Sequence, residues 1–464
     1  MSRRNVDLGS GSVGKLLFSL AVPTITSQIV NMLYNLVDRV YIGHMQPVET
    51  VGKLALTGVG VCLPIIMVIS AFAALMAFGG APRASIAEGR GDLKESERIM
   101  GNSFTMLMAV SVVLTVVFLV FAEPMLRIFG ASDNTIGYAL NYMRIYALGT
   151  IFVQVTLGMN AYITAQGFTV VGMKTVLIGA ILNTVLDPIF IFAFGMGVRG
   201  AALATLIARV VEMALMLVFC FLPSSPLRGR LREYISFTPA FTGKVLLKTL
   251  PILLNESCWA VGTMLYVRAY GHIGTHAIAA SQICNTVQNL FMVACFSLAS
   301  SSLVMIGNQI GAGRREQAVI YSRRFSKLAL LVGLILGIAV ALSAPAILTL
   351  FKVSEQAARA AVAMLRIFSL IAPIRVLNVV LIVGVFRGGG DAGFSLAAEG
   401  VTMWTIGVPL AFLGAVTLRL PVEQVVLLIT LEEIVKCVIA LFRLRSNRWL
   451  HEVAIGMGEK SRAE

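Results

Sequence analysis

The chain of 464 residues contains 58% hydrophobic and only 13% charged residues, and its mean hydropathy is +0.87. Soluble domains carry about 25% charged residues, so this composition excludes an ordinary soluble fold. The formal net charge of +14 does not indicate a nucleic-acid partner. The basic residues lie in short runs between apolar blocks, as in the loops of multispanning membrane proteins.

Apolar blocks recur along the chain, each near the length of about 20 residues that crosses the hydrocarbon core as a helix. Strand-type alternation is absent from the sequence, so we predict an all-α, polytopic membrane protein with twelve transmembrane helices. The predicted spans are 16–42, 54–80, 100–122, 140–165, 172–194, 200–222, 245–270, 277–307, 321–344, 361–386, 394–416 and 422–443. The apolar run after the N-terminal arginines is too long for a signal peptide, so we expect the first residues to remain as a tail.

The distribution of Lys and Arg predicts the orientation of these spans. If the N-terminus is cytoplasmic, the inner segments hold about three times as many basic residues as the outer ones. We therefore expect both termini on the cytoplasmic side.

The two halves of the sequence resemble each other. "VYIGHM" at 40–45 aligns with "RAYGHI" at 268–273, and Pro188 later aligns with Pro409. Six spans in each half imply parallel repeats around an axis along the membrane normal, and two such bundles leave a cleft between them, as in transporters. The predicted domains are an N-lobe (1–222), a cytoplasmic linker (223–244), a C-lobe (245–443) and a cytoplasmic tail (444–464).

Polar side chains form a stripe on the first predicted span. Gln28, Asn31, Asn35 and Asp38 recur at intervals of three and four, which places them on one face of a helix. Lipid cannot solvate such a stripe, so it must face the protein interior or a wet cavity. Asp38 also neighbours Arg39, and a merely solvated position at the headgroup level is the alternative.

The fifth and sixth spans add further polar residues. Asn183 and Asp187 lie one helical turn apart, although Asp187 precedes Pro188 and would also suit the start of a broken helix. Thr205, Arg209 and Glu212 share a face of the next span. For Arg209 and Glu212 we favour an internal salt bridge over a transport role.

In the second half, aromatic residues join an acid on the equivalent face. Glu256, Trp259, Thr263 and Tyr266 share one face of the seventh span, and the eighth span presents Asn285 and Gln288. A carboxylate beside aromatic rings suits a hydrophobic organic cation, whereas ordinary packing and an interfacial aromatic belt are the alternatives. Glu399 is a weaker candidate, and we interpret Glu432 and Lys436 as an ordinary helical ion pair.

Several of these stretches resemble the multidrug and toxic compound extrusion (MATE) family of cation-coupled antiporters. They are "LAVPTITSQIVNMLYNLVDRVYIG", "LNTVLDPIFIF" followed by "GVRGAALAT", "FRGGGD", and "LEEIVK" followed by "FRLRSNRW". The resemblance covers essentially the whole chain. It is strongest to the prokaryotic branch that places its coupling acids in the N-lobe.

The resemblance implies two six-helix lobes that form a V-shaped cleft and alternate between outward-open and inward-open states. It implies export of hydrophobic cationic small molecules in exchange for H⁺ or Na⁺. The protein would lie in the lipid bilayer of the plasma (inner) membrane of a prokaryote. It would need no cofactor, bind no nucleic acid and have no obligate protein partner. The coupling residues would be Asp38, Asn183, Asp187 and Thr205, and the first three would ligate a metal ion only if the coupling ion is Na⁺. The residues expected in the substrate cleft are Gln28, Asn31, Tyr34, Asn35, Glu256, Trp259, Thr263, Tyr266, Asn285 and Gln288. Many relatives carry a glutamate where this chain has Trp259.

Three alternative functions differ from this one in the residues they require. A lipid-linked precursor flippase would have a more cationic central cavity, for which Arg209, Arg366 and Arg375 are the candidates. An intramembrane enzyme would need a nucleophile with a base, or a metal cluster, at helical spacing. A channel would need a symmetric ring of filter residues. The sequence shows neither of the last two patterns, so we predict that the protein is not an enzyme.

Overall fold

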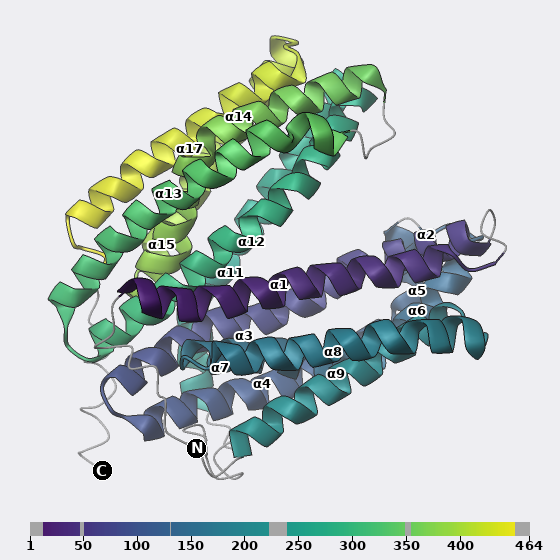
Figure 1. Cartoon of the computed structure of the whole chain (residues 1–464), viewed down its shortest axis with the longest axis horizontal. Coiled ribbons are helices and arrows are strands. Elements are labelled where there is room, and N and C mark those ends of the chain that lie inside the picture. The colour runs from purple at the N-terminus through teal and green to yellow at the C-terminus, as the bar shows by residue number, and fades with distance from the viewer. Residues whose placement is uncertain (1–12, 47–50, 130, 222–238, 349–353, 451–464) are drawn as a thin grey trace. The chain divides into compact units, whose positions relative to one another are not determined.

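Helices occupy all twelve predicted positions in the computed structural model, which describes residues 13–46, 51–129, 131–221, 239–348 and 354–450 (Figure 1). The helices of the first half are α1 (Val13–Gly43), α2 (Lys53–Val61), α3 (Leu63–Gly89), α4 (Leu93–Val120), α5 (Ala122–Ile128), α6 (Ile136–Leu148), α7 (Thr150–Ala165), α8 (Thr169–Pro188), η2 (Ile189–Ala193) and α9 (Val198–Phe221). Those of the second half are α11 (Pro239–Ile273), α12 (Thr275–Gly311), α13 (Arg315–Leu348), α14 (Glu355–Val379), η3 (Val380–Phe386), α15 (Ala392–Thr402), η4 (Met403–Gly407), α16 (Val408–Phe412), η5 (Leu413–Thr417) and α17 (Val422–Arg445). The described residues contain no strand, as the absence of alternation predicts.

The composition of the helices identifies an integral membrane protein. In the described part of the chain, nine helices are long and apolar enough to cross a membrane, and counting the bent pair α6 and α7 as one span gives ten. The first and last predicted spans correspond to α1 and α17. Leu331, Ile335 and Leu342 on α13 are exposed, Leu342 by 77%, so this helix presents an apolar surface that water would not tolerate but lipid would.

Several spans are broken, and the sequence explains where. The second span is interrupted at Cys62, two residues before Pro64, which has no backbone N–H to donate. The fourth bends by 57° between α6 and α7 at Gly149, whose missing side chain leaves room for the Leu206 methyl group. Beyond Pro188, the fifth span continues as the π-helical segment η2. π-Helical turns, like the bend at Gly149, change the direction of a helix within its span.

The halves of the chain form two compact units. One consists mainly of Phe18–Glu88 and Asp92–Thr249, and the other mainly of Leu250–Glu464. In the first, α4 packs against α7 and α8 runs beside α9; in the second, α13 packs against α14 and α17 against both α15 and α16 (Figure 1). These are equivalent pairs of spans, so each unit repeats the same helix neighbours.

The repeat extends to the break in the fifth span of each half. Pro409, which aligns with Pro188, lies in α16 between the π-helical segments η4 and η5. Most of the predicted linker, 223–244, and most of the predicted tail, 444–464, lie outside the described residues, so their boundaries stay predictions.

Candidate functional site

The four residues expected to couple transport to an ion meet inside the N-lobe. Asp38 comes from α1, Asn183 and Asp187 from α8, and Thr205 from α9, and all four are buried. The Asn183 Nδ2 atom donates to Asp187 Oδ1 at 3.3 Å and to Thr205 Oγ1 at 3.4 Å. Asp38 lies near enough to Asp187 for their charges to interact. The fold therefore places two acids from different helices, Asp38 of α1 and Asp187 of α8, in one polar cluster.

Oxygen atoms in this cluster lack hydrogen-bond partners among the described residues. They are Asp38 Oδ1, Asp187 Oδ2, Asn183 Oδ1 and, on the same face of α1, Asn31 Oδ1. A buried acceptor without a donor is costly. A proton on a carboxylate, or a hard cation with oxygen ligands, would remove this cost.

The position of Asp187 excludes the capping role considered from the sequence. Asp187 lies inside α8, and the helix continues through Pro188 into η2. Its carboxylate accepts from Asn183 of the same helix. Asp187 is therefore part of the polar interior of the N-lobe.

A small cavity of about 10 Å³ adjoins the cluster, enough for about one water molecule. Its polar lining consists of Asn31, Tyr34, Asn183, Thr205, Arg209 and Glu212. Arg209 Nη1 lies 2.7 Å from Glu212 Oε2, so the predicted salt bridge is confirmed. The guanidinium also donates to the Tyr34 hydroxyl and lies 5.5 Å above that ring.

The other residues expected in the cleft from α1 have different surroundings. Asn35 is exposed, and its side-chain amide donates to the Asn31 carbonyl one turn earlier at 2.6 Å. Gln28 is half-buried. Of the α1 stripe, Asn31 and Asp38 thus supply the oxygens that lack partners.

A larger cavity of about 290 Å³ lies within the C-lobe. It is lined by five residues expected to contact substrate, namely Trp259, Thr263, Tyr266, Asn285 and Gln288. A second cavity of about 80 Å³ contains Glu256 and shares Trp259 with the first. The helical spacing therefore identified residues that share a cavity, although their arrangement depends on charges that the sequence analysis set aside.

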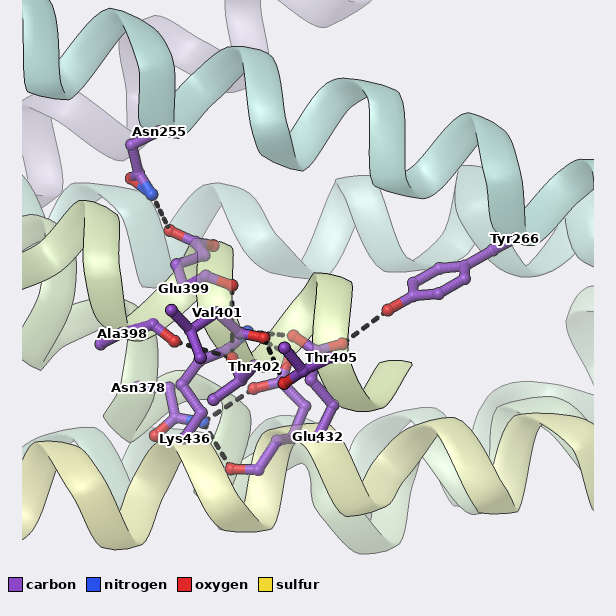
Figure 2. Close-up of polar contacts among 11 residues, drawn as sticks. Asn255, Tyr266, Asn378, Ala398, Glu399, Val401, Thr402, Thr405, Glu432 and Lys436 are labelled. Carbon is purple, nitrogen blue, oxygen red and sulfur yellow. Dashed lines mark hydrogen bonds and ion pairs between the residues drawn. The ribbon is translucent and has the colours of Figure 1, made fainter. Parts of the chain in front are cut away.

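The first group of these charges surrounds Lys436 on α17 (Figure 2). The Lys436 Nζ atom lies 2.6 Å from Glu432 Oε1 and 3.6 Å from Glu433 Oε1. The Tyr266 hydroxyl donates to Glu432 Oε2 at 2.6 Å, and Asn378 Nδ2 donates to Glu433 Oε2 at 2.7 Å. The predicted ion pair of Glu432 and Lys436 is confirmed, but it belongs to a network that connects α11, α14 and α17.

The second group links Glu399 to Glu256. Asn255 Nδ2 donates to Glu399 Oε2 at 2.8 Å (Figure 2). Arg387 Nη2 donates to Asn255 Oδ1 at 2.7 Å and forms an ion pair with Glu256 Oε1 at 2.9 Å. Glu256 is thus already paired with a cation, which weakens its expected role as the group that attracts a cationic substrate.

The sequence analysis missed Asn255, Asn378 and Arg387 as partners. Asn255 and Asn378 are polar residues inside apolar spans, which is a usable signal because such residues seek partners within the protein. Arg387 begins the glycine-rich stretch "RGGGD", which suggests a turn and therefore did not indicate a buried ion pair. Their contacts are between helices, and no periodicity along one helix indicates them.

Comparisons with known proteins agree with this fold. A family model described as MatE matches residues 23–189 and 251–413, one stretch in each half. The probable multidrug resistance protein YoeA of Bacillus subtilis is 22% identical over 407 residues, which cover 86% of this chain and 87% of the relative. The probable multidrug resistance protein NorM of Thermotoga maritima is 23% identical over 406 residues, which cover 86% of this chain and 85% of the relative.

The solved structures extend the agreement to three dimensions. A transporter of the MOP superfamily from Pyrococcus furiosus matches with a TM-score of 0.86 at 22% identity, over 96% of this chain and 98% of that chain. At this identity the likeness shows the fold. Since the family model covers most of the chain and matches it twice, the chain belongs to the MatE family of membrane transporters.

Proposed function

We propose that the protein is a secondary active multidrug efflux antiporter that exports hydrophobic organic cations in exchange for H⁺ or Na⁺. The observation that carries the proposal is the group of buried, unpartnered oxygens contributed by Asp38, Asn183 and Asp187. The names of the relatives from B. subtilis and T. maritima support multidrug export. The antiporter would lie in the inner membrane of a prokaryote, with both termini cytoplasmic.

The N-lobe cluster is the proposed coupling site because, in the described chain, neither Asp38 nor Asp187 forms an ion pair within 4 Å and each keeps an oxygen without a hydrogen-bond partner. When H⁺ or Na⁺ enters from outside, it neutralises negative charge shared by Asp38 and Asp187. The change alters the contacts of α1 with α8 and α9, and the transporter then releases its cargo outward. Each charge moved inward in excess of the charge exported contributes about 2.3 kcal/mol per 100 mV of membrane potential, whereas a one-for-one exchange of monovalent cations depends on the ion concentration gradient alone.

The two coupling ions make different demands on Asn183. The amide nitrogen of Asn183 donates hydrogen bonds to Asp187 and Thr205. A donor facing these oxygens suits a cluster that holds a proton or no ion. A Na⁺ ion between these residues would require the amide to rotate, so that Oδ1 replaces Nδ2 as the facing atom. The described residues contain no group of three His, Cys, Asp or Glu side chains suited to a metal ion, so a Na⁺ site would depend on the amide and hydroxyl oxygens.

The flippase alternative has less support from the charges. Arg209 is neutralised by Glu212, and Arg366 is exposed on α14. Of the three arginines considered, only Arg375 lines a cavity in the C-lobe and forms no ion pair within 4 Å in the described chain. One such arginine does not make the strongly cationic cavity that a pyrophosphate would need.

The test is efflux of an ethidium-like cation from proteoliposomes under a Na⁺ gradient at symmetric pH and, separately, under a pH gradient without Na⁺. We expect one gradient to drive efflux. We also expect Asp38→Asn and Asp187→Asn each to lower the coupled rate by about tenfold or more, since each replaces a titratable carboxylate with an amide that cannot become charged. Asp133→Asn is the matched control, because the Asp133 side chain is 91% exposed. Wild-type coupled export by Asp38→Asn would refute this site.

A further inference from the structure

The exposed side of α13 changes from apolar to basic toward the start of the helix. Its exposed apolar residues recur at helical spacing and are Leu330, Leu331, Leu334, Ile335, Ile338 and Leu342. Arg323, Arg324 and Lys327 lie on the same side, because each comes four or seven residues before Leu330 or Leu331. All three basic side chains are exposed. They form what we call the basic end of α13.

The length of the helix places the basic end at the level of the lipid headgroups. Arg324 and Leu342 are about 27 Å apart along the helix axis, at about 1.5 Å per residue. The hydrocarbon core of a bilayer is about 30 Å thick. When the apolar side chains of α13 lie in hydrocarbon, the basic end therefore reaches the edge of one leaflet. Long basic side chains at such a position extend toward the polar headgroups.

The protein does not neutralise these three charges itself. In the part of the chain that the structure describes, Arg323, Arg324 and Lys327 form no ion pair within 4 Å and no side-chain hydrogen bond. The one acid of α13, Glu316, lies in the first turn, about two turns before Arg323. By contrast, the exposed Arg359 of α14 is paired with an acid one turn away. The basic end is therefore free to bind an anion from outside the protein.

The equivalent helix of the N-lobe, α4, has the apolar side without the cations. Gly91 and Gly313 have φ values of 78° and 74° and lie two residues before α4 and α13, which fixes the register of the repeat. Four exposed valines occupy the positions that match the later part of the α13 side, namely Val112, Val113, Val116 and Val120. The positions that match the basic end hold the uncharged residues Gly101, Asn102 and Thr105. The repeated fold therefore does not require cations at this place, and the basic end is specific to the C-lobe.

We propose that the basic end of α13 binds the headgroups of anionic phospholipids. The planar guanidinium groups of Arg323 and Arg324 can each donate two parallel hydrogen bonds to a phosphate, and Lys327 adds a compact charge beside them. The apolar side chains that follow on α13 offer a surface for the acyl chains of the same lipid, which a soluble phosphate would not use. With the orientation proposed above, these lipids belong to the cytoplasmic leaflet, where anionic headgroups attract basic segments next to a span.

The first test measures lipid binding by the full-length protein in detergent micelles. Native mass spectrometry during titration with phosphatidylglycerol or phosphatidylcholine would give a dissociation constant for each lipid. The two lipids can have the same acyl chains, but only phosphatidylglycerol has a net negative charge. We expect phosphatidylglycerol to bind about tenfold or more tightly, since each cation near a membrane surface raises the affinity for anionic lipid by a factor of about five. Equal binding of the two lipids would overturn the proposal without any variant.

The second test removes the two guanidinium groups. Arg323→Gln combined with Arg324→Gln should abolish most of the preference for phosphatidylglycerol, whereas Arg323→Lys combined with Arg324→Lys should keep part of it because the charge stays. The charge-matched control is Arg90→Gln combined with Lys94→Gln, which removes two exposed cations at the start of α4. The control should keep the wild-type preference. An equal loss in the control, or an unchanged preference in the α13 glutamine variant, would overturn the proposal.

A third measurement separates a lipid from a soluble anion. Glycerol phosphate contains the glycerol and phosphate groups of the lipid but has no acyl chains. We expect an excess of about a hundredfold not to displace phosphatidylglycerol, because glycerol phosphate cannot use the apolar side of α13. Displacement would identify a site for a soluble phosphate and would overturn the assignment to lipid.

Lipid binding by Asp38→Asn separates this inference from the proposed efflux function. Asp38 lies in the N-lobe, so we expect this variant to keep the wild-type preference for phosphatidylglycerol even though its coupled export is lost. Loss of ion coupling with an intact lipid preference is therefore the expected result for this variant. Loss of the lipid preference in Asp38→Asn would contradict a site confined to α13.

Discussion

Among the described residues of the N-lobe, the acids Asp38 of α1 and Asp187 of α8 each keep an oxygen without a hydrogen-bond partner, whereas in the C-lobe Glu432 and Glu433 of α17 each have an amide, hydroxyl or cationic partner. Asp38 and Asp187 represent the first arrangement. Glu432 and Glu433, which share Lys436, represent the second. Both lobes have the same helix neighbours, so the scaffold does not decide the difference; the side chains placed in it do.

This difference indicates separate roles for the two lobes. Buried acids without counter-charges respond to the arrival of a proton or cation, because the charged and neutral forms differ in free energy. Acids held by a lysine and amides respond less, since their charge is already compensated, and they fix helices in place. The contrast supports the proposed ion coupling in the N-lobe, which remains to be tested by the efflux assay described above.

The largest expected effect on stability comes from removing the cation of the C-lobe. Lys436→Met leaves the buried carboxylate of Glu432 and the half-buried one of Glu433 without their shared partner, and should lower the free energy of unfolding by about 3 to 5 kcal/mol. Thermal unfolding in detergent would measure it, with Lys327→Met, an exposed lysine on α13, as the control. Adding Glu432→Gln to Lys436→Met should restore part of the loss. If Lys436→Met unfolds like the wild type, the network does not hold the C-lobe together.

A smaller effect is expected from adding one methyl group beside each lobe's buried glutamate. At Gly407, a Cβ atom would lie 2.6 Å from Glu432 Oε2 and would also collide with the Tyr266 hydroxyl, so Gly407→Ala should destabilise the protein by about 1 to 3 kcal/mol. At Gly179, a Cβ atom would lie 3.4 Å from Glu212 Oε2, an ordinary contact. Gly179→Ala should be neutral or slightly stabilising. Equal unfolding temperatures for the two variants would contradict the tighter packing inferred for the C-lobe.

The smallest effect is expected outside both polar interiors. Arg127 and Glu123 form an ion pair at 3.1 Å near the end of α5, with about half of each side chain exposed. Exposed pairs of this kind gain little because water and salt screen them. Glu123→Gln should leave the unfolding temperature and the efflux rate unchanged. A clear drop in either would show that this surface pair has a role beyond that of an exposed contact.

The sequence was informative wherever the signal lies within one helix. Apolar length located the spans, and the spacing of Asn183 and Asp187 placed both side chains on one buried face. The salt bridge of Arg209 with Glu212 and the ion pair of Glu432 with Lys436 also follow from helical spacing. The interruptions at Pro64 and Gly149 were not predicted, because proline and glycine are tolerated within membrane helices and their effect depends on the neighbours.

What the sequence determined by itself was a helical membrane protein with a duplicated chain and an acidic N-lobe interior, since hydropathy and a period of 3.6 residues are properties of local sequence. Only the tertiary structure decided which charges neutralise one another. It placed Glu256 in an ion pair with Arg387 and Glu399 in a hydrogen bond with Asn255. Arg375 lines a cavity and forms no ion pair within 4 Å in the described chain. The physical reason is that an ion pair between helices depends on distances in space, which helical packing sets and spacing along the sequence does not record.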